Sequence, residues 1–197
     1  MQQRVDGTRI GELQGVVASA LEEARRLGAT QAEVDANLQQ GLTVNVRLGE
    51  VDTVEYQRDR GLGVTVYIGH RKGSASTADL APAADKANVA KACTIARYTA
   101  EDPYSGLAEP GMLATSIPDL DLYHAWKIEP ADAVELARCC ESAGREVDPR
   151  ITNSEGASVS THRGVHVYGN SLGFLAGFPS SSHTVSCRYA CGNARRS

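Results

Sequence analysis

The spacing of apolar residues changes near Ala32, and this change constrains the fold more strongly than any other feature of the sequence. In residues 10–27, apolar residues recur at helical spacing, which predicts an amphipathic helix. Thr8 is its expected N-cap, and Gly28 occupies the position of a glycine that ends a helix. In residues 42–48, apolar and polar residues alternate, which predicts a half-buried strand.

The alternation continues beyond an expected turn at residues 49–50. Residues 54–56 extend it into a second strand, "RDRG" predicts another turn, and residues 62–68 line one face of a third strand. These short strands follow one another without intervening helices. The sequence therefore predicts an antiparallel β-meander.

The glycine-rich stretch "RGLGVTVYIGHRKG" could be a phosphate-binding loop or a hairpin. A phosphate-binding loop needs glycines at the exit of a strand, followed at once by a helix. Here Gly61 and Gly63 begin a strand, and "GHRKG" joins that strand to another extended run. The sequence therefore predicts a polar hairpin tip that places Arg71 and Lys72 in solvent.

Two further helices are predicted after the meander. The first opens at Asp79 and Pro82, and the second runs from Pro130 to just before Pro149. A long irregular segment lies between them, and loops of this length often carry function. The residues expected on the apolar faces of the two helices are Val89, Ala92, Cys93, Ala96, Tyr98, Val134, Ala137 and Cys140.

The last third of the chain is predicted to contain short strands. In residues 150–187, "SEG", "HRG", "GNS" and "GFPSSS" are expected to interrupt them. The predicted fold class is α+β, with antiparallel β-meander sheets packed against about three helices.

Charge and hydropathy exclude several classes of function. The 197 residues carry a net charge of −4 with no basic stripe, so direct binding to nucleic acid is not expected. The start of the sequence lacks the apolar core of a signal peptide, and no apolar run is long enough to span a membrane, so we expect neither feature. The five cysteines form no disulfide framework, and Cys187-x-x-x-Cys191 is a weak metal motif. We expect a cytoplasmic protein without membrane partners.

The motif "HRGVH" has the histidine spacing of a zinc protease but is not expected to bind zinc. His162 and His166 lie among β-branched residues and glycine, so a strand would separate them by about 13 Å. Arg163 occupies the position of the general base. We therefore expect no metal in this chain.

Other candidate catalytic groups are incomplete. Asp119 and Asp121 form a carboxylate pair without a third ligand. Ser182 is adjacent to His183 but lacks a nucleophile elbow and an orienting acid. Glu155 in "TNSEG" is expected to be a turn residue. From these residues alone, the chain has no complete active site.

Several segments together resemble the N-terminal domain of the PmbA (TldE) branch of the TldD/PmbA family. They are "GEVDTVEYQRDRGLGVTVYIGHRKGSASTADLAP", "IARYTAEDPYSGLAEPGML", "PDLDLYH" and "RITNSEGASVSTHRGVHVYGNSLGFLAGFPSSSH". The resemblance implies a bacterial cytoplasmic protein, once called a modulator of DNA gyrase. It also implies pairing with TldD as a metalloprotease that acts on unfolded or modified peptides, such as microcin precursors and antitoxins.

The resemblance carries over no catalytic residue, because the family's zinc motif, HExxxH, belongs to the C-terminal half of TldD. The expected zinc therefore belongs to the TldD partner. The expected domain covers residues 1–187. Residues 188–197 are interpreted as a divergent tail from truncation or a frameshift, and the family's C-terminal domain is expected to be absent.

Two hypotheses for function follow. The first is a non-catalytic protease subunit that binds or encloses peptide substrates and forms a heterodimer with a TldD-like subunit. The second is a protease-independent interaction module that modulates DNA gyrase. The residues proposed to contact a peptide or partner are Arg71, Lys72, Asn153, Glu155 and Asn170.

Overall fold

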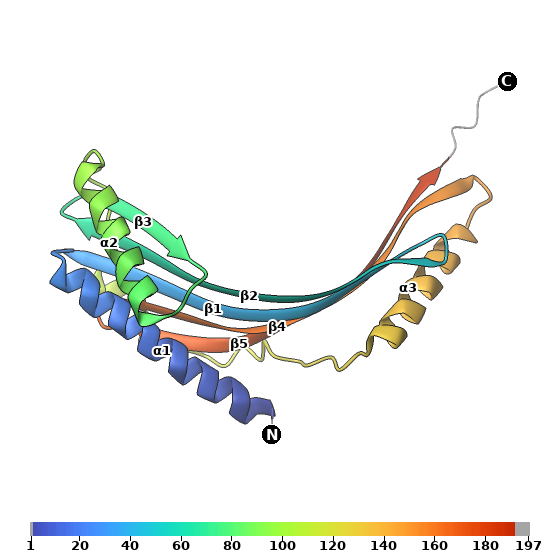
Figure 1. The fold of residues 1–197 in the computed structure, drawn as a ribbon, viewed down its shortest axis with the longest axis horizontal. Coiled ribbons are helices and arrows are strands. Elements are labelled where there is room, and N and C mark those ends of the chain that lie inside the picture. Colours follow the sequence, from blue (N-terminus) through green and yellow to red (C-terminus); the bar gives the residue numbers. More distant parts are fainter. Residues whose placement is uncertain (1, 192–197) are drawn as a thin grey trace. The chain divides into compact units, whose positions relative to one another are not determined.

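The structure is a computed structural model that describes the backbone of residues 2–191 and the side chains of residues 8–191. It has an α+β fold, as the sequence predicts (Figure 1). In chain order, its elements are α1 (Gln2–Arg26), β1 (Gln31–Arg47), β2 (Glu50–Ile68), β3 (Arg71–Thr77), α2 (Pro82–Tyr98), the short 3₁₀ helix η1 (Pro110–Met112), α3 (Pro130–Arg145), β4 (Ile151–Asn170) and β5 (Leu175–Cys191).

The five strands form one sheet in the order β3-β2-β1-β4-β5. Hairpins join β1 to β2, β2 to β3 and β4 to β5, and the β2–β3 pair is antiparallel from Leu62 opposite Thr77 to Ile68 opposite Arg71. The β1–β2 turn lies at Leu48 and Gly49, which have φ angles of 52° and 81°. Positive φ at both central residues gives the twist that two-residue hairpins favour.

The described chain divides into two compact units. Unit 1 comprises residues 2–39, 59–122 and 164–180, and unit 2 comprises residues 40–58, 123–163 and 181–191. The four longest strands contribute residues to both units.

The core of unit 1 lies between one sheet face and the helices α1 and α2. Val17 and Ala20 of α1 and Val89 of α2 are fully buried, as are the alternate strand residues Val34 and Val66. The predicted inward positions Ala92, Cys93 and Ala96 are therefore confirmed. Tyr98 is 87% exposed, because it lies two residues after Ala96 and so on the opposite side of the helix.

The core of unit 2 lies between α3 and the strands. Ala133 and Ala137 of α3 pack with Val44 and Val159, while Val134 and Cys140 lie at the margin of this cluster. Small residues on α3 let the helix approach the sheet closely.

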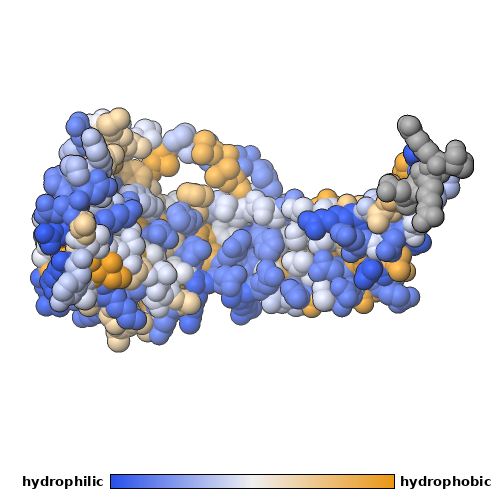
Figure 2. All heavy atoms as spheres, turned by 90° about the horizontal axis from the view of Figure 1, so that it is seen from above, coloured by the Kyte–Doolittle hydropathy of each residue, from blue (hydrophilic) through white to orange (hydrophobic). Residues whose placement is uncertain are grey.

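The molecular surface is largely hydrophilic in the view of Figure 2, with apolar residues in small groups.

Glu141 attaches α3 to the β1–β2 turn. It is 2% exposed, and its carboxylate accepts hydrogen bonds from the backbone N–H of Leu48 at 2.9 Å and of Gly49 at 2.8 Å. Arg138 donates to the Gly49 carbonyl at 2.8 Å. A buried carboxylate is tolerated here because both of its oxygens have donors.

The start of the first helix and the length of the second strand differ from the sequence-based prediction. Helix α1 starts at Gln2, so Thr8 lies inside the helix and is not its N-cap. Strand β2 runs without interruption through "RDRG". Residues 54–60 are all exposed, and burial alternates only from Gly61 onward, so the charged segment continues the strand in solvent without a turn.

The predicted interruptions of the last third are also wrong, except at "GNS", which forms the β4–β5 turn. Gly156 has a φ of +110° within β4, and a Cβ at Gly164 would collide with the carbonyl of Leu38 on β1. These glycines therefore allow close strand contact rather than turns. Pro179 is accommodated because β5 is an edge strand.

Strand β5 also includes part of the predicted tail. Residues 188–191 belong to it, and the Tyr189 hydroxyl donates to the carbonyls of Cys140 at 2.8 Å and Glu141 at 3.2 Å. Residues 188–191 therefore continue the sheet and contact α3, and the interpretation of residues 188–197 as a divergent tail stays a prediction. Residues 192–197 lie outside the described part of the chain.

Candidate functional site

In unit 2, one edge of β2 has no neighbouring strand among the described residues. Strand β3 pairs only with residues 62–68, so Glu50–Arg58 of β2 have no strand beside them on that side within the described residues. All of these residues are exposed except Thr53, which is partly buried. We call residues 50–58 the free β2 edge. Its outward N–H and C=O groups can pair with another extended chain.

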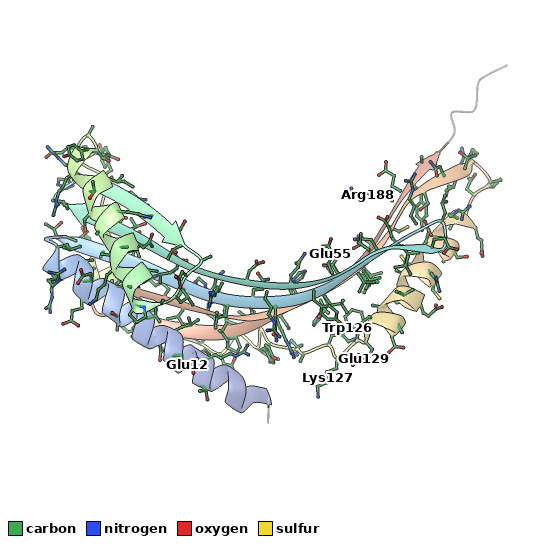
Figure 3. The ribbon with its side chains drawn as sticks, in the orientation of Figure 1. Glu12, Glu55, Trp126, Lys127, Glu129 and Arg188 are labelled. Carbon is green, nitrogen blue, oxygen red and sulfur yellow. The ribbon has the colours of Figure 1, made fainter. Side chains whose placement is uncertain are left out.

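The other outer strand, β5, is contacted by the segment that precedes α3. The Ser181 hydroxyl donates to the His124 carbonyl at 3.0 Å and accepts from the His124 N–H at 2.8 Å. His183 Nε2 donates to the same carbonyl at 2.7 Å. The Trp126 ring, labelled in Figure 3, packs edge-on against His183 with ring centroids 5.5 Å apart. The long irregular segment is therefore anchored to β5 in unit 2.

These contacts explain why Ser182 and His183 do not form a catalytic pair. Adjacent residues of a strand point to opposite faces of the sheet. His183 instead places its Nδ1 2.9 Å from the Thr161 hydroxyl and its Nε2 on the His124 carbonyl. Trp126 and His124 were not predicted as anchoring residues; His124 ends the "PDLDLYH" segment, and Trp126 follows two residues later.

Two of the predicted contact residues lie at the β2–β3 hairpin, in unit 1. Arg71 is not simply in solvent, because it forms an ion pair with Glu101 at 3.3 Å and donates to the Arg97 carbonyl at 3.3 Å. Lys72 is exposed, and its ammonium lies 6.0 Å from the centre of the Tyr67 ring. The hairpin itself is as predicted, with Gly69 at a φ of 61°.

The other three predicted contact residues lie on β4. Asn153 and Glu155 are exposed residues of unit 2. Asn170 belongs to unit 1 and is 4% exposed. Its side-chain oxygen accepts from the N–H groups of Leu172 at 3.0 Å and Phe174 at 3.2 Å, so it stabilises the β4–β5 turn. The structure thus gives Asn170 a structural role.

The "HRGVH" histidines both lie on β4, as expected. His166 packs against Phe178, with ring centroids 5.6 Å apart. A strand advances about 3.3 Å per residue, so two rings four residues apart cannot share one zinc ion. In the described part of the chain, no three His, Cys, Asp or Glu side chains, including Asp119 and Asp121, are grouped to hold a metal.

The five cysteines are all free thiols. Cys93 is buried in the core of unit 1, and burial raises the pKa of its thiol. Cys140 on α3 is half-buried and interacts with Cys187 on β5. Burial, followed by this neighbouring thiol, raises the pKa of Cys140, which disfavours the reactive thiolate.

Two domain models of one family match the chain. PmbA/TldA metallopeptidase domain 1 matches residues 32–96, and the PmbA/TldA metallopeptidase central domain matches residues 123–196. The chain belongs to the PmbA/TldD metallopeptidase family. The resemblance recognised in the sequence is confirmed. The expected single domain over residues 1–187 stays a prediction.

Curated relatives share substantial sequence with this PmbA/TldD family member. It is 46% identical over 174 residues to the metalloprotease PmbA of Escherichia coli O157:H7, covering 88% of this chain and 38% of the relative. It is also 46% identical over 176 residues to the PmbA homolog of Haemophilus influenzae, covering 89% and 39%. The chain therefore spans well under half of the length of these relatives.

Solved structures show the same fold. A protein from Bacteroides thetaiotaomicron described as a modulator of DNA gyrase matches with a TM-score of 0.82 and 23% identity, over 94% of this chain and 43% of that protein. TldE from Thermococcus kodakarensis matches with a TM-score of 0.70 and 16% identity, over 91% of this chain and 40% of that protein.

No helix among the described residues is long and apolar enough to cross a membrane.

Proposed function

We propose that this chain is a non-catalytic, peptide-binding part of a PmbA/TldE-like subunit that acts with a TldD-like metallopeptidase subunit. The observation that carries the proposal is the free β2 edge, which presents unpaired backbone groups in a member of a metallopeptidase family. An extended peptide adds to such an edge through main-chain hydrogen bonds, which tolerate many side-chain sequences. This suits unfolded or modified peptide substrates.

The catalytic zinc is assigned to the partner in this proposal. Zinc supplies a Lewis acid and an activated water for hydrolysis when three protein ligands hold it. The "HRGVH" histidines do not fit this requirement, because they lie on one strand with Arg163 between them. This chain's own residues would bind and orient the peptide and exclude water from it. The expected location is the cytoplasm.

Hydrogen exchange with an unfolded peptide tests the peptide-binding role. We expect added peptide to slow exchange of those amides of Glu50–Arg58 that point away from β1, because they would donate hydrogen bonds to the new strand. Amides of α3 serve as the control and should not change. Protection confined to other strands, or absent altogether, would contradict peptide binding at this edge.

Affinity purification from the native cell tests the partner. We expect this chain to recover a TldD-like subunit. The second candidate function, modulation of DNA gyrase, is favoured by the description of the Bacteroides structural relative. Recovery of gyrase without a TldD-like subunit would support that alternative and exclude the protease role.

A further inference from the structure

The free β2 edge is complementary to itself. When two identical strands pair antiparallel around Glu55, Asp52 lies opposite Arg58, Val54 opposite Tyr56 and Thr53 opposite Gln57. A two-fold axis repeats each of these pairs. The pairing therefore contains two opposite-charge pairs and two apolar pairs, which are the cross-strand combinations that stabilise antiparallel sheets.

We propose that a second copy of this chain docks on the free β2 edge, so that the two β2 strands pair antiparallel across a two-fold axis at Glu55. This inference concerns self-association and does not rest on the proposed peptide-binding function. Figure 3 labels Glu55 on β2, where β1 lies on one side of the strand and no strand lies on the other side within the described residues.

Exposure supports a partner at this edge. Val54 is 43% exposed and Tyr56 is 72% exposed, although both are large apolar or aromatic side chains on a strand. Asp52 and Arg58 are also exposed, and no hydrogen bond or ion pair of either side chain is found within the described residues. These side chains are therefore available for a second copy, which would cover the apolar pair and neutralise the charges.

Other two-fold registers fit less well. A shift that places Glu50 opposite Arg58 leaves Asp52 opposite Tyr56. A shift in the other direction places Val54 opposite Arg58. Of these three registers, only the one centred on Glu55 places Asp52 opposite Arg58 and Val54 opposite Tyr56, while Val51 lies opposite Asp59. Charge complementarity thus selects both the occupant and its register.

One position opposes this pairing. In the proposed register Glu55 lies opposite Glu55 of the second copy, and like charges directly opposite each other are unfavourable. Its neutral analogue, Glu55→Gln, should therefore strengthen the dimer. This expectation is specific, because a merely structural role for Glu55 does not predict tighter self-association.

The test is sedimentation velocity of the full chain, from low micromolar to millimolar concentration and without peptide. We expect a monomer–dimer equilibrium that Asp52→Arg or Arg58→Asp weakens by about ten-fold or more, because each change creates two like-charge pairs. The double variant Asp52→Arg with Arg58→Asp should restore it, and Glu55→Gln should strengthen it. Arg188→Asp, an exposed charge reversal on β5, is the matched control and should have no effect.

Covalent trapping tests the register separately from the charges. In a background with the exposed cysteines Cys139 and Cys191 changed to serine, Glu55→Cys should form a disulfide-linked dimer, because residue 55 faces itself across the axis. Asp52→Cys should not, because residue 52 faces Arg58. A monomeric chain at all concentrations, a dimer unaffected by the charge reversals, or trapping through residue 52 would overturn the proposal. Peptide binding could still hold in each case.

Discussion

At the scale of single residues, buried acids show how local contacts set the stability of each unit. In unit 2, burial by itself raises the pKa of Glu141, but hydrogen bonds from Ser154 and from the N–H groups of Leu48 and Gly49 outweigh it, so the pKa lies below its usual range. In unit 1, burial, followed by the nearby Glu23 carboxylate, raises the pKa of Asp85. Asp85 Oδ1 and Asn88 Oδ1 have no hydrogen-bond partner among the described residues.

Replacing Glu141 with alanine should destabilise the protein by about 1–3 kcal/mol, because two backbone N–H groups lose their acceptor. A carboxylate whose pKa is lowered on folding stabilises the protein above its unfolded pKa, near 4.3, and this contribution is lost as pH falls through the folded value. Urea denaturation should therefore show a large difference from wild type at pH 7 and a smaller one at pH 3. Glu135→Ala, an exposed change on the same helix, should have little effect at either pH.

Replacing Asp85 with asparagine should change stability in the direction opposite to Glu141→Ala. A carboxyl group whose pKa is raised on folding destabilises the protein as pH rises above its unfolded value, near 3.9. The variant should be more stable than wild type by about 1 kcal/mol at pH 7, because no charge remains buried, and equally stable at pH 3. A wild-type chain that is more stable than the variant at pH 7 would show that Asp85 is ionised and paired.

At the scale of elements, long-range side-chain contacts connect helices to strands. Tyr189 of β5 reaches the carbonyls of Cys140 and Glu141 on α3, and a Cβ at Gly144 would collide with its ring. Burial, followed by Cys187, raises the pKa of Tyr189 to about 12. The C-terminal part of β5 is therefore bound to α3 rather than free.

Changing Tyr189 to phenylalanine removes the hydroxyl that donates to both carbonyls. We expect unfolding at a lower denaturant concentration, with a loss of about 1 kcal/mol, as for a typical intramolecular hydrogen bond. The control is Cys191→Ser, a change at an exposed residue two positions after Tyr189, which should change stability little. If the two variants were equally stable, the Tyr189 hydroxyl would bond to water in the unfolded chain as favourably as it bonds to the two carbonyls in the folded chain.

At the scale of the whole molecule, the chain spans 38–39% of the curated PmbA relatives. Its own histidines lie on β4 without the arrangement that zinc needs. Under the proposed function, peptide cleavage therefore needs a partner that carries the metal.

The isolated chain should not cleave unfolded peptides in a chelator-sensitive way, and it should hold less than one zinc ion per chain after tag-free purification. His162→Ala and His166→Ala should leave this result unchanged. Mass-spectrometric peptide assays with and without a chelator measure the activity, and elemental analysis measures the zinc. Chelator-sensitive turnover that either substitution abolishes would restore the zinc-protease interpretation.

Sequence periodicity by itself determined the approximate positions of α1, α2 and α3 and the inward residues of the strand segments at residues 42–48 and 62–68. The burial of Val44 and Val66, the start of α3 at Pro130 and the hairpin before Arg71 follow from spacing, turn residues and proline, all of which act within a few residues. The same local signals misplaced the breaks in β2, β4 and β5, because a glycine required for close strand contact resembles a glycine required for a turn.

Only the tertiary structure decided which distant groups meet. The acceptors of Leu48 and Gly49 lie 92–93 residues away on Glu141, and the donor for the Cys140 carbonyl lies 49 residues away on Tyr189. The free β2 edge exists because β3 is short, pairing with residues 62–68 and no further. Such pairings depend on chain topology, which hydrophobic spacing within a single segment does not encode.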